Sequence, residues 1–188
     1  MMKNFKNAFL LLISMTVAGE GAVTKEGEEF GPFGRLPGHQ RNPTLAIGPN
    51  GGFVAWQHST QATDGDRVVV GRLNALLEGQ GSPTRLTGDL KRNTESNPSI
   101  ALLPNGGAVV SWESGGRNDR EVRMRLVNAV GGYQTGVEKV NSFTRGNQKA
   151  PAVSANAQGE IMVAWESEHQ DGYGKGIFAR RYTAVGVR

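Results

Sequence analysis

One stretch of about 15 residues occurs three times in this chain of 188 residues. The copies read NPTLAIGPNGGFVAW (42–56), NPSIALLPNGGAVVSW (97–112) and APAVSANAQGEIMVAW (150–165). Each copy ends on one of the three tryptophans of the protein, and the prolines that open the copies are 55 and 53 residues apart. Self-similarity at a period of this order indicates an array or a propeller of repeated units, each too small to bury its own hydrophobic face.

Each copy predicts a β-hairpin. Apolar residues alternate with other residues on both sides of a turn that carries Gly51, Gly106 or Gly159, and glycine accepts the positive φ of tight turns. After the turn, a valine and the tryptophan share one face of the strand. The residue between them is always small, and these residues are Ala55, Ser111 and Ala164. The pattern predicts strands covered on both faces, with a neighbouring sheet close to the small residues.

Two further short strands follow each hairpin. The third strand is predicted at 68–75, 122–129 and 177–184, and a fourth segment at 84–87 and 138–141. Four short antiparallel strands in a unit of about 54 residues match a propeller blade. The predicted fold class is all-β, with three propeller-like blades in units of about 40–93, 94–147 and 148–188. The alternative is an open stack of β-sheets.

The third unit ends after its third strand. Residues 20–35 are predicted to be a linker that could supply the closing strand of the repeat domain, 36–188. Three blades are too few for a ring, since propellers have four to eight, and open sheet edges invite pairing. We therefore expect a homodimer, or further repeats, to close the propeller.

The first 19 residues match a secretory signal peptide. Lys3 and Lys6 precede the uncharged run 8–18, and small residues follow at Ala18 and Gly19. The run is too short to span a bilayer, so no membrane span is expected once the leader is cleaved. The predicted location is secreted, periplasmic or at the cell surface.

Composition excludes several functions. The chain has no cysteine, so thiolate metal sites and a cysteine nucleophile are excluded. The net charge is +4, and the basic residues are scattered without forming a stripe. A nucleic-acid partner is therefore not expected.

The repeat resembles a tandem propeller-like repeat of bacterial secreted and cell-surface proteins. The resemblance rests on NGGAVVSWES (105–114), the Asp/Gly loop and IFARRYTAVG (177–186), and it covers residues 36–188. The repeat is also similar to the blades of sialidase-type propellers. That similarity implies an arginine triad and a tyrosine nucleophile with a glutamate partner. However, Arg72, Arg125 and Arg181 fall on equivalent strand positions and are explained by the repeat itself.

Two groups of residues are candidate sites. The first is the polar residue after each tryptophan, which could form a ring of shallow ligand sites with the tryptophans as apolar platforms. It comprises Gln57, Glu113 and Glu166 with Trp56, Trp112 and Trp165. The competing interpretation places the tryptophans in the core, where large aromatic residues are mostly found. The second group is the loop aspartates, which could bind calcium or simply form turns. They are Asp64, Asp66, Asp119 and Asp171.

A catalytic group is needed once and should interrupt a repeat. No residue does so clearly, and no cofactor other than calcium is suggested. The sequence therefore predicts a non-catalytic module that binds a glycan or a surface protein, or that is structural. The alternative is a fragment of a sialidase-like glycoside hydrolase.

Overall fold

The computed structural model describes residues 23–60, 65–87 and 94–183. The predicted signal peptide and Asp64 lie outside these residues. The chain divides into two units, 1–30 and 31–188. Residues 23–30, the described part of the first unit, contain no helix or strand. The described residues of the second unit form only strands, turns and loops, so no helix among them is long and apolar enough to cross a membrane.

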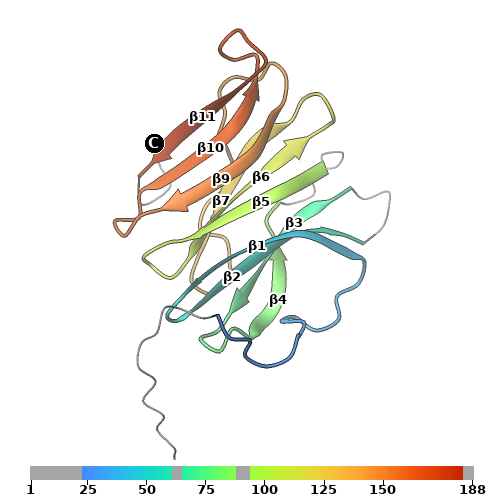
Figure 1. Cartoon of the computed structure of the whole chain (residues 1–188), viewed down its shortest axis with the longest axis vertical. Coiled ribbons are helices and arrows are strands. Elements are labelled where there is room, and N and C mark those ends of the chain that lie inside the picture. Colours follow the sequence, from blue (N-terminus) through green and yellow to red (C-terminus); the bar gives the residue numbers. More distant parts are fainter. Residues whose placement is uncertain (1–22, 61–64, 88–93, 184–188) are drawn as a thin grey trace, which may run out of the picture. The chain divides into compact units, whose positions relative to one another are not determined.

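The second unit contains three antiparallel sheets (Figure 1). Sheet 1 consists of β1 (His39–Gly48), β2 (Gly51–Ser59), β3 (Arg67–Leu73) and β4 (Gly79–Arg85). Sheet 2 consists of β5 (Thr94–Leu102), β6 (Ala108–Gly115), β7 (Glu121–Val127) and β8 (Glu138–Lys139). Sheet 3 consists of β9 (Gln148–Ala155), β10 (Ile161–Glu168) and β11 (Lys175–Tyr182), with β10 in the middle.

The predicted hairpins form as expected. Gly51, Gly106 and Gly159 have φ values of 104°, 79° and 79°, which only glycine adopts readily. The strands of sheets 1 and 2 pair in chain order, as a meander does. The predicted all-β class, with three propeller-like blades, is confirmed. The third blade has three strands rather than four, and no described strand pairs with the edge of β11 that faces away from β10.

The sheets stack through two apolar seams. In the first seam, Trp112, Val110 and Ile100 of sheet 2 pack on Ala55 and Val70 of sheet 1. The second seam repeats the arrangement, because Trp165, Val163 and Ile161 of sheet 3 pack on Val109 and Met124 of sheet 2. In each seam the face that carries a tryptophan covers the face that carries the small residue. The alternation of large and small residues along the strand thus determines which sheet covers which.

Residues 31–36 do not extend sheet 3 as a closing strand. They form turns and loop, and the Phe33 ring lies 5.5 Å from the Trp56 ring, centroid to centroid. Gly71 and Gly79 leave room for Phe33, since a Cβ on either would lie less than 3 Å from its ring. The prediction of a closing strand at 20–35 therefore differs from the described part of this segment, which covers the tryptophan of sheet 1 instead.

Candidate functional site

The first strand of every sheet contains a β-bulge at the same position. The bulge residues Asn42, Asn97 and Ala150 have φ values of 50°, 49° and 49°, and the strand register shifts beside each of them. Each is followed by the proline of the repeat, which lacks an N–H and is accommodated in a sheet mainly at edges and bulges. At the first two bulges, the side chain of the bulge residue donates a hydrogen bond to the polar residue that follows the tryptophan on the next strand, Gln57 or Glu113.

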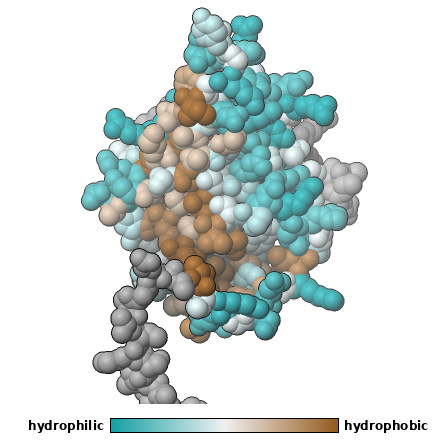
Figure 2. Space-filling model, in the orientation of Figure 1, coloured by the Kyte–Doolittle hydropathy of each residue, from teal (hydrophilic) through white to brown (hydrophobic). Residues whose placement is uncertain are grey.

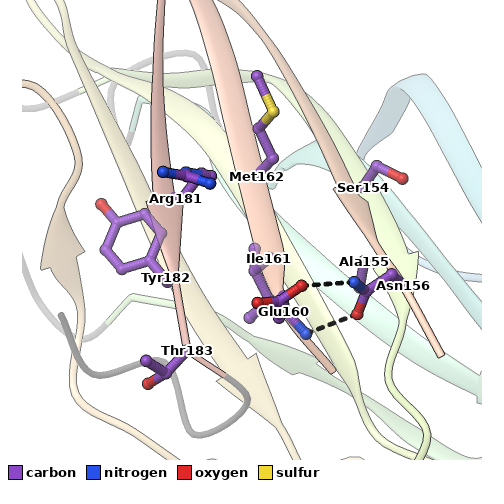
Figure 3. Close-up of a pocket in the computed structure, with 9 residues that line it drawn as sticks. All are labelled: Ser154, Ala155, Asn156, Glu160, Ile161, Met162, Arg181, Tyr182 and Thr183. Atoms are coloured by element: carbon purple, nitrogen blue, oxygen red, sulfur yellow. Dashed lines mark hydrogen bonds between the residues drawn. The ribbon is translucent and has the colours of Figure 1, made fainter. Parts of the chain in front are cut away.

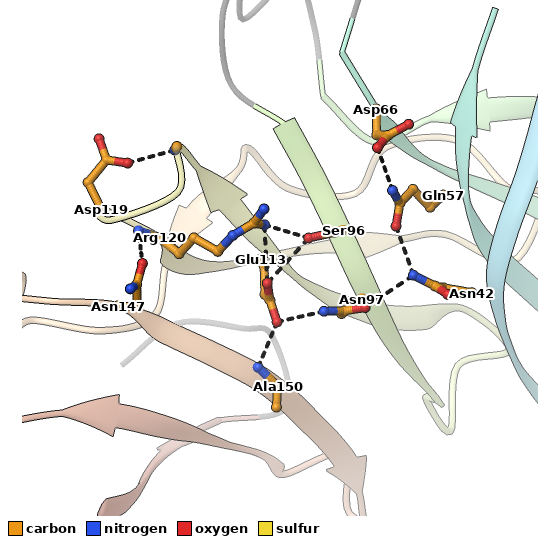
Figure 4. A network of polar contacts seen from close by, with 11 residues as sticks. Asn42, Gln57, Asp66, Ser96, Asn97, Glu113, Asp119, Arg120, Asn147 and Ala150 are labelled. Atoms are coloured by element: carbon orange, nitrogen blue, oxygen red, sulfur yellow. Dashed lines mark hydrogen bonds and ion pairs between the residues drawn. The ribbon is translucent and has the colours of Figure 1, made fainter. Parts of the chain in front are cut away.

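A network of hydrogen bonds runs along these bulges from sheet 1 to sheet 3 (Figure 4). In sheet 1, the Asn42 side-chain amide donates to Gln57 Oε1 at 2.9 Å, and Gln57 Nε2 donates to Asp66 at 2.5 Å. Asn42 Nδ2 also lies 3.2 Å from Asn97 Oδ1, which links sheet 1 to sheet 2. The repeat therefore places equivalent polar groups of adjacent sheets within hydrogen-bonding distance.

Glu113 is the centre of this network and is 3 % exposed. Its Oε1 accepts hydrogen bonds from Asn97 Nδ2 at 2.8 Å and from the Ala150 backbone N–H at 2.9 Å. Its Oε2 accepts from Arg120 at 3.1 Å and from the Ser96 hydroxyl at 3.3 Å. Both carboxylate oxygens are therefore fully used within the protein. Glu113 joins sheets 2 and 3 and has no free lone pair directed to a ligand.

Glu166 occupies the equivalent position in sheet 3 but has different surroundings. The bulge residue beside it is Ala150, which has no side-chain amide to donate. Its Oε2 pairs with Lys175 at 3.0 Å, and the side chain is 36 % exposed. The Glu166 carboxylate raises the pKa of Lys175 by hydrogen bonding and by its charge. Of the three predicted polar residues, Glu166 is the most accessible, since Glu113 and Gln57 are only 3 % and 6 % exposed.

The three tryptophans are core residues. Trp112 is fully buried, and Trp56 and Trp165 are each 5 % exposed. The core interpretation of the tryptophans is confirmed, and none of them offers an open ring face as a platform for a ligand in this structure.

The described aspartates lie in separate loops and form local hydrogen bonds. Asp66 pairs with Arg41 at 2.7 Å, Asp119 accepts from the Gly116 N–H at 2.6 Å, and Asp171 accepts from the Tyr173 N–H at 3.2 Å. Among the described residues, no group of three or more acidic or histidine side chains could hold a metal ion. Asp66, Asp119 and Asp171 thus serve as turn and network residues.

Two residues at the same end of the sheets were not singled out by the sequence. Glu95 and Gln148 are equivalent in the repeat and stand two residues before the bulge, at the first and second seams. Gln148 Oε1 accepts from the indole N–H of Trp165 at 3.2 Å. Glu95 Oε2 accepts from the Val68 N–H and the Thr87 hydroxyl. Burial raises the pKa of Glu95 above its usual value.

No protein-family model matches the sequence, and no curated protein matches it either. Solved structures share its fold. A Penicillium chrysogenum α-L-arabinanase complexed with arabinobiose is 17 % identical, with a TM-score of 0.50 over 80 % of this chain and 48 % of its own. The α-L-arabinofuranosidase of Fusarium graminearum is 16 % identical, with a TM-score of 0.50 and the same two coverages.

A protein of unknown function from Dyadobacter fermentans has a TM-score of 0.55 and 17 % identity, over 81 % of this chain and 40 % of its own. The chain thus spans about half the length of these structures, or less. At this identity the likeness establishes the fold, an incomplete β-propeller. These similarities do not show a specific relation to sialidases.

These comparisons correct one expectation. The sequence favoured a non-catalytic binding, adhesion or structural module and no enzymatic activity. The arabinanase and the arabinofuranosidase described above are both glycoside hydrolases. The alternative of a glycoside hydrolase fragment therefore agrees better with the findings than the non-catalytic module does.

Proposed function

We propose that this chain supplies three blades of a propeller glycoside hydrolase that acts on a plant-type or surface polysaccharide. The observation that carries the proposal is the Glu166 carboxylate. Glu166 is equivalent in the repeat to Gln57 and Glu113, but its hydrogen-bond partners differ from theirs. Glu113 accepts hydrogen bonds from four donors, whereas among the described residues Glu166 accepts from Lys175 through one oxygen. A group with a special role is expected to interrupt a repeat in this way.

The chemistry suits an ionised carboxylate at this place. In glycoside hydrolysis, the bond between the anomeric carbon and the leaving oxygen breaks, and water finally supplies a hydroxyl to the carbon and a proton to the leaving oxygen. One carboxylate acts as nucleophile or base in its ionised form, and Glu166 offers a carboxylate that forms an ion pair with Lys175 at 3.0 Å. The second carboxyl, the general acid, comes from a neighbouring blade.

The similar structures support the reaction class, and the predicted signal peptide supports a location outside the cytoplasm. We propose export through the predicted signal peptide, because polymeric glycans are met outside the cytoplasm. The resemblance to repeats of bacterial secreted and surface proteins points the same way. N-terminal sequencing of exported protein tests this directly. The expected mature chain begins after Ala18 or Gly19, and an intact Met1 terminus in exported protein would contradict it.

Activity is tested on the full-length chain with a substrate panel. The panel holds arabino-oligosaccharides, aryl arabinofuranosides and an aryl sialoside, and the release of reducing sugar or of the aryl group is measured. We expect turnover of at least one arabinose-containing substrate. Glu166→Gln should lower it by about 100-fold or more, because the ionised group is lost. The matched control is Glu160→Gln in the β9–β10 turn, which should retain activity. No turnover across the panel overturns the proposal.

A further inference from the structure

The two outermost faces of the stacked sheets are complementary to each other. A small-residue face and a tryptophan face meet in both internal seams, so each seam has one face of each kind. Among the described residues, the stack therefore has one outer face of each kind that no other sheet covers. The free small-residue face belongs to sheet 3 and is formed by Ala152, Ala164, Ala179 and Met162. The tryptophan face of sheet 1 is free along β1 and the facing part of β2, at Leu45, Ile47 and Val54, while Phe33 covers Trp56 itself.

Exposure at equivalent positions shows that sheet 3 lacks its cover. Phe53 and Val109 hold the same repeat position as Met162, and their exposures are 2 % and 0 % against 49 %. Val70 and Met124 hold the same position as Ala179 and are buried, whereas Ala179 is exposed. The difference arises because sheets 2 and 3 cover the first two faces. Sheet 3 thus presents a face of the kind that another sheet covers elsewhere in this molecule.

A groove of about 550 Å³ lies at the turn end of this face (Figure 3). Ser154, Met162 and Arg181 form one row across β9, β10 and β11 along it. The equivalent row in sheet 1 contains Ala46, Phe53 and Arg72, and Leu102 of sheet 2 packs against Phe53 and its neighbours. The repeat position of Leu102 corresponds to Ile47 in sheet 1. Figure 2 shows hydrophobic surface collected in a band on the displayed face.

The free tryptophan face carries the matching side chains. Leu45 and Ile47 on β1 are 61 % and 52 % exposed, while the equivalent Ile100 on β5 is 7 % exposed. In the internal seams it is the first strand of a sheet, β5 or β9, that packs across the preceding sheet. Phe33 covers Trp56, Gly71 and Gly79, so it lies over β2, β3 and the start of β4. The part of β1 that a seam of this kind requires remains open.

We propose that the small-residue face of sheet 3 binds the tryptophan face of sheet 1 in a second copy of this chain. The occupant is identified by continuity with the two internal seams, which join the same two kinds of face. Because each copy has both faces, two copies related by a two-fold axis form two identical new seams. The result is a closed ring of six sheets, within the four to eight of closed propellers. Further blades of another chain are the competing occupant.

Light scattering on the full-length chain tests this proposal. We expect twice the chain mass for the wild type. Ala164→Arg places a charge on the small-residue face, and Leu45→Asp with Ile47→Asp places two on the tryptophan face. Each variant should weaken the dimer by about 100-fold or more, since a charge buried in an apolar seam has no partner. Ala157→Arg and Leu76→Asp in exposed turns are the matched controls and should remain dimeric. Cooperative unfolding of each variant verifies folding.

Mixing the two damaged variants distinguishes this arrangement from others. The Ala164→Arg chain keeps a sound tryptophan face, and the doubly substituted chain keeps a sound small-residue face. Their mixture should therefore form a heterodimer through a single seam. A monomeric wild type overturns the proposal and favours further blades as the occupant. A dimer sensitive to Ala164→Arg alone also overturns it, because sheet 3 would then be packing on sheet 3.

Discussion

The two internal seams share one apolar design but differ in their polar groups. At the second seam, Gln148 accepts the indole N–H of Trp165, and the Ser99 hydroxyl accepts the N–H of Val153. At the first seam, Glu95 stands where Gln148 does, and both its Oε1 and the Trp112 Nε1 are buried without a hydrogen bond. The comparison teaches that the repeat determines the packing, while one exchange of Gln for Glu changes how a seam responds to pH.

The largest effect is expected from truncating a seam tryptophan. Trp112 is fully buried among apolar residues of sheets 1 and 2. Trp112→Ala should lower the free energy of unfolding by about 3–5 kcal/mol, through lost burial and the cavity left behind. Urea unfolding monitored by circular dichroism measures it. Met162→Ala on the exposed face is the control, and it should cost less than about 1 kcal/mol in a monomeric background. Equal losses would contradict the assignment of the core.

Replacing Glu95 by Gln should remove a pH dependence of the unfolding free energy that arises at the first seam and not at the second. The pKa of Glu95 is raised in the folded state, chiefly by burial. The folded protein therefore holds this proton more tightly than the unfolded chain does. The resulting stabilisation is complete below the unfolded pKa, about 4.3, and is lost as pH rises through the folded pKa. Unfolding free energies of wild type and Glu95→Gln should diverge as the pH rises above the unfolded pKa, in favour of the variant. Parallel curves would rule out this role.

Exchanging each tryptophan for phenylalanine separates the seams by their hydrogen bonds. Trp165→Phe leaves the Gln148 Oε1 buried and without its donor, whereas Trp112→Phe removes an N–H that had no acceptor. Both changes create a similar cavity. Trp165→Phe should therefore cost about 1 kcal/mol more than Trp112→Phe, the usual cost of a buried group left unpaired. Thermal and urea unfolding measure the difference, and a larger cost for Trp112→Phe would reverse the comparison.

The smallest effect is expected at the third bulge. Ala150 adopts a φ of 49°, a left-handed conformation that costs an L-residue about 1–2 kcal/mol and that asparagine tolerates better. Ala150→Asn copies the residue of the other two bulges and should stabilise the chain by about 0.5–1 kcal/mol. The reciprocal Asn97→Ala should destabilise, since it also removes the bond to Glu113. A loss of stability in Ala150→Asn would show that the bulges are not equivalent.

Much of the fold could be predicted from the sequence, because the repeat length indicates the number of sheets and the alternation of residues along a strand indicates which face is buried. The alternation around Trp56 and Ala55 determines which face is apolar and which is small, and the Asn-Gly-Gly turns determine the hairpins. The sequence offered residues 20–35 as a linker that could supply a closing strand, and the described residues of this segment contain no strand. Gly38 and Gln40 align in the repeat with Gly146 and Gln148, and these matches suggested a closing segment before the first proline. In the structure they mark the start of the first strand of a sheet, β1 or β9. They do not mark the end of the preceding sheet.

The site was less accessible to sequence reasoning. The position after each tryptophan was recognised as polar, but Gln57, Glu113 and Glu166 looked equivalent. Their difference depends on contacts between sheets, such as the Ala150 N–H on Glu113, and on a bulge residue that lacks an amide. The repeat also concealed that Glu95 replaces a glutamine, since only the seam around it makes the exchange costly. Such information resides in long-range contacts that spacing alone does not report.

The central claim is that one seam design joins the sheets and leaves two complementary faces. The chain has no cysteine, so a designed disulfide tests it directly. Within the second seam, the Ser99 hydroxyl lies 3.1 Å from the Val153 N–H, and the equivalent pair across a new seam is Ala152 with Leu45. The double variant Ala152→Cys and Leu45→Cys should oxidise to a covalent dimer in a non-reducing gel. Ala152→Cys with Leu76→Cys should not. A monomeric product from the first variant would contradict the claim.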